Sequence, residues 1–391
     1  MHFTRNRLIV LASLFALVLA AGIFVACGGD SGGTTTATPT AAATTPAGGS
    51  PTVTASGGAV EACPPSGAAT ALTGAGATFP APLYEDWFAR YKDLCGVEVN
   101  YQAIGSGGGI TQITAKTVDF GASDGIMNAD QKAAADPIHH IPMTSDAVAV
   151  VYNLEGIDSG AITLDSTTLA NIFLGTITKW NDPAIAALNS GVTLPSEDIA
   201  VVHRSDGSGT TFIFTNYLSK VSSDWQSQVG NATSVQWPTG TGAEGNAGVA
   251  GQVQQLPNSI GYVSLAYAVQ NNIDFAKMKN KSGNAIEPSI DSARAAQKGI
   301  TLPDNMEVML TDSSDADAYP ITGFTWLLVY VEQSDKAKAE TLAHMIHWML
   351  TDAQQYAEGD SYVPLSDTAV EKAMAELADT TFQGTPILEL K

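Results

Sequence analysis

A strand-like run passes into a helix-like one across the stretch Val201-Val202-His203-Arg204-Ser205-Asp206-Gly207-Ser208-Gly209-Thr210-Thr211-Phe212. The β-branched residues at its start predict a strand that ends at Arg204, and the apolar residues that recur beyond it predict a helix. The turn between them should open that helix at Ser208, Gly209 and Thr210. Unpaired N–H groups and the dipole of a helix N-terminus attract anions, and the arginine adds a fixed positive fork. The stretch therefore predicts a site for a small oxyanion.

The composition argues against one large class of partners. The chain has 391 residues, enough for two domains, and it carries 18 Lys and Arg against 39 Asp and Glu, a net charge of -21. A nucleic-acid partner requires a basic face, so none is expected. An anionic small molecule stays compatible with this charge, because a buried ligand responds to nearby N–H dipoles and charges rather than to the far field.

The first residues have the layout of an export signal. Two arginines precede an apolar run over residues 8–26, and Cys27 follows it directly. This order predicts a lipoprotein signal peptide over residues 1–26 with a lipid on Cys27, although Phe24 departs from the aliphatic residue usual at that position. The run is also long enough for an uncleaved membrane anchor. Both alternatives place the protein outside the cytoplasm and attached to the cell membrane.

A low-complexity segment separates this signal from the folded body. Residues 27–61 are mostly Gly, Ser, Thr, Ala and Pro, with few large apolar side chains. Such a segment cannot bury a core, so it predicts a flexible tether.

Two further cysteines predict a disulfide. In an exported protein Cys63 and Cys95 are expected to pair. The first strand is expected from Leu72, and the first helix from Pro80 to its end at Gly96. Cys63 precedes that strand and Cys95 ends that helix, which places both at the same end of a strand–helix unit. The alternative is two unrelated buried thiols.

The remaining chain alternates strands and helices, which predicts an α/β fold with ligand-binding loops at the carboxyl ends of strands. Residues 271–318 are polar and show no clear periodicity. Strands are expected at 97–101, 146–152, 260–263 and 321–331, and helices at 166–173, 183–188, 249–256, 336–350 and 368–377.

Three turns of small residues each follow a strand and open a helix, at 76–79, 105–109 and 207–210. Glycine and serine are ordinary turn residues, so one such turn is weak evidence. Three of them, with Arg204 beside one and Asp124 in a fourth loop, can hold a tetrahedral oxyanion without a metal.

These stretches resemble one known family. Thr73-Gly74-Ala75-Gly76-Ala77-Thr78-Phe79-Pro80-Ala81-Pro82, Asp119-Phe120-Gly121-Ala122-Ser123-Asp124 and Arg204-Ser205-Asp206-Gly207-Ser208-Gly209-Thr210 are similar to the motifs of the substrate-binding proteins of phosphate ABC transporters, the PstS family. The resemblance extends from about residue 71 to at least residue 370.

The resemblance implies a two-lobed, hinge-connected periplasmic-binding-protein fold of type II. Lobe I would comprise residues 70–143 plus 320–391, and lobe II residues 144–319. It also implies a monomeric binding protein, not an enzyme, that needs no cofactor or metal. Its partners would be inorganic phosphate and the membrane permease and ATPase of a phosphate ABC transporter.

The family's ligand-binding positions carry over to eight residues of this chain: Thr78, Phe79 (through its backbone), Ser106, Asp124, Arg204, Ser208, Gly209 and Thr210. Asp124 is the selective member. A carboxylate only accepts hydrogen bonds, so beside an anion it is repulsive unless the anion brings a proton. Phosphate carries a proton near neutral pH and sulfate carries none, so Asp124 is expected to favour phosphate.

Two neighbouring residues complete the predicted site, and a third lies outside it. Asp206 is expected to hold the Arg204 guanidinium, the alternative being a turn aspartate that bonds its own backbone. Gly107 stands where the family often has a second serine, which removes one hydroxyl donor. Strand alternation points His203 away from Arg204, so it is left out of the site.

Two functions compete with phosphate transport. An exported phosphatase related to this family is the main alternative, and a binding protein for another oxyanion such as sulfate or molybdate is the other. Gly240-x-Gly242-x-x-Gly245 matches a dinucleotide fingerprint but follows no clear strand, so we interpret it as a loop at the edge of the cleft. The His139-His140 and His344/His347 pairs are expected to be ordinary histidines rather than metal ligands.

Overall fold

The structure is a computed structural model, and it describes residues 60–389. The predicted signal peptide at 1–26, the lipidation site Cys27 and nearly all of the tether at 27–61 lie outside the described residues. Within residues 60–389, none of the helices combines the length and the apolar character that a membrane crossing requires.

One mixed sheet of nine strands organises the described residues, in the order β2-β1-β3-β12-β4-β8-β6-β7, with β9 also pairing with β4. Its strands are β1 (Ala71–Gly76), β2 (Glu98–Ala103), β3 (Phe120–Ser123), β4 (Ile138–Asn153), β6 (Ala200–Arg204), β7 (Thr241–Ala243), β8 (Ser259–Ser264), β9 (Asp274–Phe275) and β12 (Thr322–Tyr330). The predicted α/β fold is confirmed.

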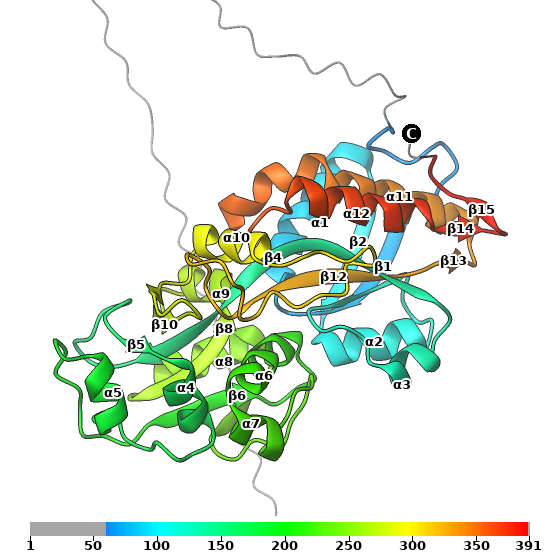
Figure 1. Ribbon diagram of the computed structural model, residues 1–391. Coiled ribbons are helices and arrows are strands. Elements are labelled where there is room, and N and C mark those ends of the chain that lie inside the picture. The colour runs from blue at the N-terminus through cyan, green and yellow to red at the C-terminus, as the bar shows by residue number, and fades with distance from the viewer. Residues whose placement is uncertain (1–59, 390–391) are drawn as a thin grey trace, which may run out of the picture. The chain divides into compact units, whose positions relative to one another are not determined.

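Strand β4 joins the two halves of this sheet. Strands β2, β1 and β3 are mutually parallel on one side, and β8, β6 and β7 are parallel on the other. The 16-residue β4 pairs antiparallel with β12 along its first part and with β8 along its second. Figure 1 shows β4 and β12 running side by side between the two groups of helices. Residues 140–152 of β4 are all buried, as expected of a strand covered on both faces.

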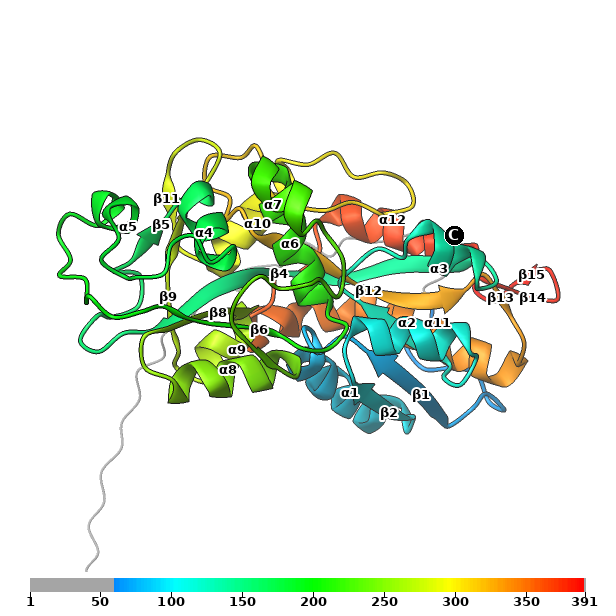
Figure 2. The ribbon, with the colours of Figure 1, turned by 90° about the horizontal axis from the view of Figure 1, so that it is seen from below.

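Helices flank the sheet on both sides, as Figure 2 shows. They are α1 (Ala81–Cys95), α2 (Ser106–Thr114), α3 (Ala129–Ala133), α4 (Ser166–Phe173), α5 (Pro183–Leu188), α6 (Gly209–Val221), α7 (Ser223–Gln228), α8 (Gly245–Gln255), α9 (Leu265–Gln270), α10 (Ile290–Lys298), α11 (Lys336–Leu350), α12 (Asp367–Ala378) and the 3₁₀ helix η1 (Asp352–Asp360). The two smaller sheets contain β5 (Thr163–Leu164), β10 (Lys277–Lys279) and β11 (Ala285–Ile286), and β13 (Glu332–Gln333), β14 (Thr381–Phe382) and β15 (Thr385–Pro386).

Two large hydrophobic clusters form the core. One contains Trp180 and Trp225 and packs α4, α6 and α8 against the β4, β6 and β8 end of the sheet. The other contains Trp87 and Trp326 and packs α1, α11 and α12 against β1, β3 and β12. Segment 290–319 contributes to both clusters, with Ala295, Met306 and Leu310 among those in the second and residues such as Ala293 in the first.

Several local predictions are confirmed. The helices expected at 166–173, 183–188 and 336–350 have those bounds. Helix α1 ends at Gly96, whose φ of 70° is left-handed and therefore suits glycine. Cys63 and Cys95 form a disulfide, so the predicted pairing is confirmed.

Two regions differ from the sequence expectation. The stretch 271–318 contains short strands and α10, which begins at a reciprocal cap between Ser289 and Ser292. The Gly240–Gly245 region is not a simple loop, since β7 pairs parallel with β6 and leads directly into α8. The sequence does not predict this strand–helix–strand context, because β7 is only three residues long and takes its strand character from pairing rather than from an apolar pattern.

Candidate oxyanion site

Two of the predicted glycine-rich turns touch each other. The Gly107 N–H at the start of α2 donates to the Gly207 carbonyl before α6, at 2.8 Å. A Cβ on Gly107 would lie 3.1 Å from the Gly207 Cα, so a serine at this position would press on the facing backbone. The departure from the family serine at Gly107 thus coincides with a close approach of the two helix N-termini.

The first turn of α6 presents free donors. Ser208 caps the helix, and its Oγ accepts the Thr211 N–H at 3.1 Å. The N–H groups of Gly209 and Thr210 belong to the helix's first residues and have no intrahelical acceptor. All three residues from Ser208 to Thr210 are buried. The predicted helix start is therefore confirmed, and it aims its dipole into the protein interior.

Arg204 and Asp206 form a buried pair. Arg204 is 2 % exposed; its Nε donates to Asp206 Oδ1 at 2.7 Å and its Nη2 to Oδ2 at 2.5 Å. The remaining nitrogen, Nη1, lies 3.4 Å from Thr210 Oγ1. Burial alone would raise the pKa of Asp206, but hydrogen bonds and the charge of Arg204 outweigh it and lower that pKa. Asp206 therefore holds the guanidinium, and a bond to its own backbone N–H also helps to lower its pKa.

Asp124 lies against this helix start. It is 1 % exposed, its Oδ1 accepts the Thr325 hydroxyl at 2.7 Å, and its backbone N–H donates to Ser106 Oγ at 3.2 Å. A Cβ on Gly209 would fall 2.5 Å from its Oδ2, so the carboxylate and the α6 N-terminus are in contact. Burial raises the pKa of Asp124 to about 7, against the opposing effects of Thr325 and Arg204.

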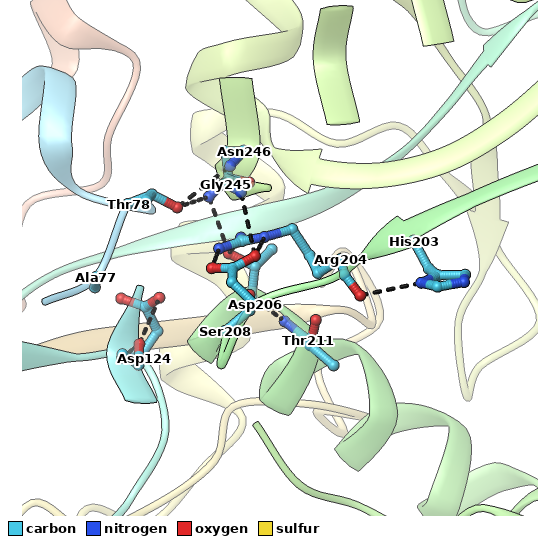
Figure 3. A network of polar contacts seen from close by, with 12 residues as sticks. Ala77, Thr78, Asp124, His203, Arg204, Asp206, Ser208, Thr211, Gly245 and Asn246 are labelled. Carbon is cyan, nitrogen blue, oxygen red and sulfur yellow. Dashed lines mark hydrogen bonds and ion pairs between the residues drawn. The ribbon is translucent and has the colours of Figure 1, made fainter. Parts of the chain in front are cut away.

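Thr78 reaches the same place through a residue that the sequence did not reveal. Asn246, fully buried in the first turn of α8, donates from Nδ2 to Thr78 Oγ1 at 2.9 Å and to Thr210 Oγ1 at 3.1 Å. Figure 3 shows Thr78 directed toward Asn246, above the Arg204–Asp206 pair. The Gly245 N–H donates to Asp206 Oδ1 at 3.1 Å, so α8 also contacts that pair.

Phe79 and Thr78 are fixed by tyrosines. The Phe79 ring is fully buried in the core, and its carbonyl accepts the Tyr362 hydroxyl at 2.6 Å. The Thr78 carbonyl accepts the Tyr267 hydroxyl at 2.7 Å. The sequence could not reveal Tyr362, Tyr267, Thr325 or Asn246, because each lies far along the chain from the residue it contacts.

His203 lies outside this constellation, as strand alternation predicted. Its ring stacks on Trp237 with centroids 4.7 Å apart, and its Nδ1 lies 3.0 Å from the Arg204 carbonyl oxygen. Figure 3 shows His203 on the side of Arg204 away from Ser208. Burial lowers the pKa of His203. It is therefore not placed to take a proton from the Ser208 hydroxyl.

Among residues 60–389, no cluster of three or more His, Cys, Asp or Glu is arranged to hold a metal ion. His139 and His140 instead pair with Glu376 and Glu307. The polar groups that converge at the N-terminus of α6 are hydroxyls, N–H groups, one arginine and two carboxylates. That set suits an oxyanion that carries a proton.

The chain matches known proteins over most of its length. Residues 35–353 match the model of the PBP superfamily domain. A protein of Pasteurella multocida named phosphate-binding protein PstS is 44% identical over 310 residues, covering 79% of this chain and 90% of that protein. Phosphate-binding protein PstS 3 of Mycobacterium bovis is 34% identical over 366 residues, covering 90% of this chain and 93% of that protein.

Solved structures share the fold. A phosphate-binding protein from Stenotrophomonas maltophilia superposes with a TM-score of 0.60 at 22% identity, covering 78% of this chain and 94% of that one. A human phosphate-binding apolipoprotein superposes with a TM-score of 0.63 at 19% identity, covering 78% and 93%. These likenesses agree with a two-lobed periplasmic-binding-protein fold. The matches to the PBP superfamily domain and to the two named relatives show that the chain belongs to the PstS family of phosphate-binding proteins.

Proposed function

We propose that this protein binds inorganic phosphate at the N-terminus of α6. The observation that carries the proposal is the buried carboxylate of Asp124, held against that helix start within the field of Arg204. The relatives that bear the name phosphate-binding protein support the same ligand. The groups proposed to hold phosphate are Thr78, Phe79 (N–H), Ser106, Asp124, Arg204, Ser208, Gly209 (N–H) and Thr210.

Hydrogen-bond donors, rather than net charge, account for the attraction. Arg204 is already paired with Asp206, and Asp124 adds a second carboxylate, so the charged side chains do not favour an anion by their sum. The helix N–H groups, the hydroxyls and the second hydrogen of Arg204 Nη1, beyond the one directed at Thr210 Oγ1, supply the favourable contacts. Buried dipoles of this kind stabilise an anion strongly because water is excluded.

Asp124 makes the site selective through one shared proton. With a pKa of about 7, the carboxyl and the bound phosphate compete for the same proton near neutral pH. Either the phosphate brings the proton and Asp124 accepts it, or Asp124 holds it and donates. Sulfate brings none, so at alkaline pH it would face an ionised carboxylate with no hydrogen between them.

The remaining parts of the proposal concern transport. Phosphate would bridge two hinge-connected lobes and stabilise their closed arrangement, and a membrane permease with its ATPase would receive phosphate from it. The packing favours extending lobe I, proposed as residues 70–143 plus 320–391, to include much of 294–319 rather than leaving all of 144–319 in lobe II. We further propose an extracytoplasmic, monomeric protein with a signal peptide at 1–26, a lipid on Cys27 and a tether at 27–61.

The protein is a binding protein and not an enzyme, in keeping with its named relatives. The phosphatase alternative is not favoured, because His203 stacks on Trp237 and does not face Ser208. Turnover of p-nitrophenyl phosphate that is abolished by Ser208→Ala would reinstate it.

Isothermal titration of the purified protein with phosphate, sulfate and arsenate at one pH tests the proposal. We expect phosphate and arsenate to bind at micromolar concentration or below, which corresponds to about -8 kcal/mol or more favourable. Sulfate should bind far more weakly. Equal affinity for sulfate and phosphate would refute the assigned ligand.

A further inference from the structure

Asn246 contacts two hydroxyls of the proposed site and donates a hydrogen bond to each of them. Its Nδ2 donates to Thr78 Oγ1 at 2.9 Å and to Thr210 Oγ1 at 3.1 Å, so both hydrogens of one amide are used. Its backbone N–H lies 3.3 Å from the same Thr78 oxygen. The side chain is fully buried, and water does not compete for these contacts.

The orientation of this amide is fixed by a third contact. Asn246 Oδ1 accepts the backbone N–H of Ser264 at 3.0 Å. An inverted amide would bring its NH₂ group against that N–H and its oxygen against the two hydroxyls. The acceptor toward Ser264 and the donors toward the threonines are therefore settled by the network.

The contacts from Asn246 and Arg204 occupy the acceptor positions of the Thr78 and Thr210 hydroxyls. A hydroxyl has two acceptor positions and one hydrogen. The Thr78 oxygen receives two donors from Asn246, and the Thr210 oxygen receives one from Asn246 and one from Arg204 Nη1 at 3.4 Å. With their acceptor positions taken, both hydroxyls have only a hydrogen left to offer.

The backbone around Asn246 holds it in this place. Gly245 has a φ of 68°, a left-handed conformation that glycine adopts without strain. Its N–H donates to Asp206 Oδ1, the carboxylate that also holds Arg204. The amide is thus anchored to the arginine pair on one side and to β8 on the other.

We propose that Asn246 is a positioning residue that commits the Thr78 and Thr210 hydroxyls to donate, so that the ligand oxygens facing them must be unprotonated. The inference rests on the proposed function and deepens it. Asp124 accepts the one proton of the ligand. Asn246, acting through the two hydroxyls, excludes a proton from the ligand oxygens that face Thr78 and Thr210. The two residues together would recognise an oxyanion by where its proton lies.

The direct test compares Asn246→Asp and Asn246→Ala with the parent by calorimetric titration of inorganic phosphate. The aspartate variant is nearly isosteric but turns the donors into acceptors, so both hydroxyls would donate to it and not to phosphate. We expect the phosphate Kd to rise at least tenfold in the alanine variant and further in the aspartate variant. The loss of phosphate affinity in the aspartate variant, relative to the parent, should shrink as pH falls from 8 to 6. Protonation of the introduced aspartate or of the phosphate restores a hydrogen to the contacts between the hydroxyls and their partners.

Asn189→Asp is the matched control. Asn189 is another buried amide that accepts from the Thr163 N–H and donates to two carbonyls, away from the proposed site. Its substitution should lower the melting temperature and leave the phosphate Kd of the folded protein unchanged, with no pH-dependent deficit.

A double-mutant cycle removes dependence on how well any single variant folds. Thr78→Val with Thr210→Val should weaken phosphate binding at least tenfold, and adding Asn246→Ala to that background should cost less than threefold more. Phosphate affinity within twofold of the parent in the threonine double variant would overturn the inference. So would additive losses, or a pH-independent deficit in Asn246→Asp. A parent that fails to bind phosphate would instead refute the proposed function, and the inference with it.

Discussion

A Cβ on Gly209 would lie 2.5 Å from Asp124 Oδ2 and 2.4 Å from Ser106 Oγ. The start of α6 is therefore in direct contact with the loop after β3, and only glycine permits this spacing. The contact brings the proposed donors of one segment against the proposed acceptor of another.

Gly209→Ala should separate these two segments. The added methyl group meets buried side-chain atoms of Ser106 and Asp124, including the Asp124 Cβ at 2.6 Å, which cannot move without its backbone, so we expect phosphate affinity to fall at least tenfold in calorimetric titration. Gly251→Ala in α8 is the control, because a Cβ there has no atom within 4 Å. The control should bind normally and be slightly more stable, by about 0.5–1 kcal/mol. Equal binding by both variants would show that the contact does not matter for the ligand.

Asp206→Asn should destabilise the protein. It leaves the buried Arg204 without a full counter-charge, and breaking such a pair costs about 3–5 kcal/mol. Urea unfolding monitored by circular dichroism measures this loss. Asp86→Asn serves as the control, since Asp86 pairs with Arg90 at the surface and exposed pairs contribute about 1 kcal/mol or less. A loss at Asp206 no larger than that at Asp86 would contradict the structural role assigned to the pair.

The disulfide should affect stability without affecting binding. Closing a loop over the sequence separation of 32 between Cys63 and Cys95 contributes about 3–4 kcal/mol in the chain-entropy account. The double variant Cys63→Ser with Cys95→Ser should lose that much in urea unfolding and keep its phosphate Kd. The bond joins the segment before β1 to the end of α1, away from the site residues. A large change in Kd would indicate that α1 positions Thr78 through this link.

Asp146 should make stability depend on pH. It is fully buried on β4, and burial raises its pKa to about 7, although Ser264 and backbone N–H groups oppose this. The folded state therefore binds more protons than the unfolded state between pH 4 and 7, so stability should fall as pH rises across that window. In Asp146→Asn the free energy of unfolding should decrease less across this window than in the parent, by a few kcal/mol. Parallel stability–pH curves for variant and parent, from urea unfolding at several pH values, would contradict the assignment.

The sequence predicted the parts of the site that are local. The run from Arg204 to Thr210 contains its own strand end, cap and helix start. Gly96 marks the end of α1 because glycine adopts the left-handed conformation of a helix end without strain. Such features depend on a few adjacent residues, which is why they can be recognised without the rest of the fold.

Other parts of the site depend on pairing between distant segments. The local sequence does not distinguish Thr325 from other residues of a buried strand. Only the β12–β3 register places it beside Asp124. Asn246 follows a three-residue strand that only its pairing with β6 defines. The buried face of α10 consists of small and polar residues such as Ser292, Ala293 and Ala296, and it lacks the large apolar side chains that indicate a core-facing helix in a sequence.

The central claim is that Asp124 selects the ligand by its proton, and titration at pH 8.5 with phosphate and with sulfate tests it most directly. The parent should prefer phosphate by about a hundredfold or more, and sulfate binding should strengthen as pH falls through the Asp124 pKa of about 7, where the carboxyl can donate. Asp124→Asn supplies a permanent donor, so it should bind sulfate at every pH and lose most of the preference. An unchanged preference for phosphate in Asp124→Asn at pH 8.5 would contradict the account.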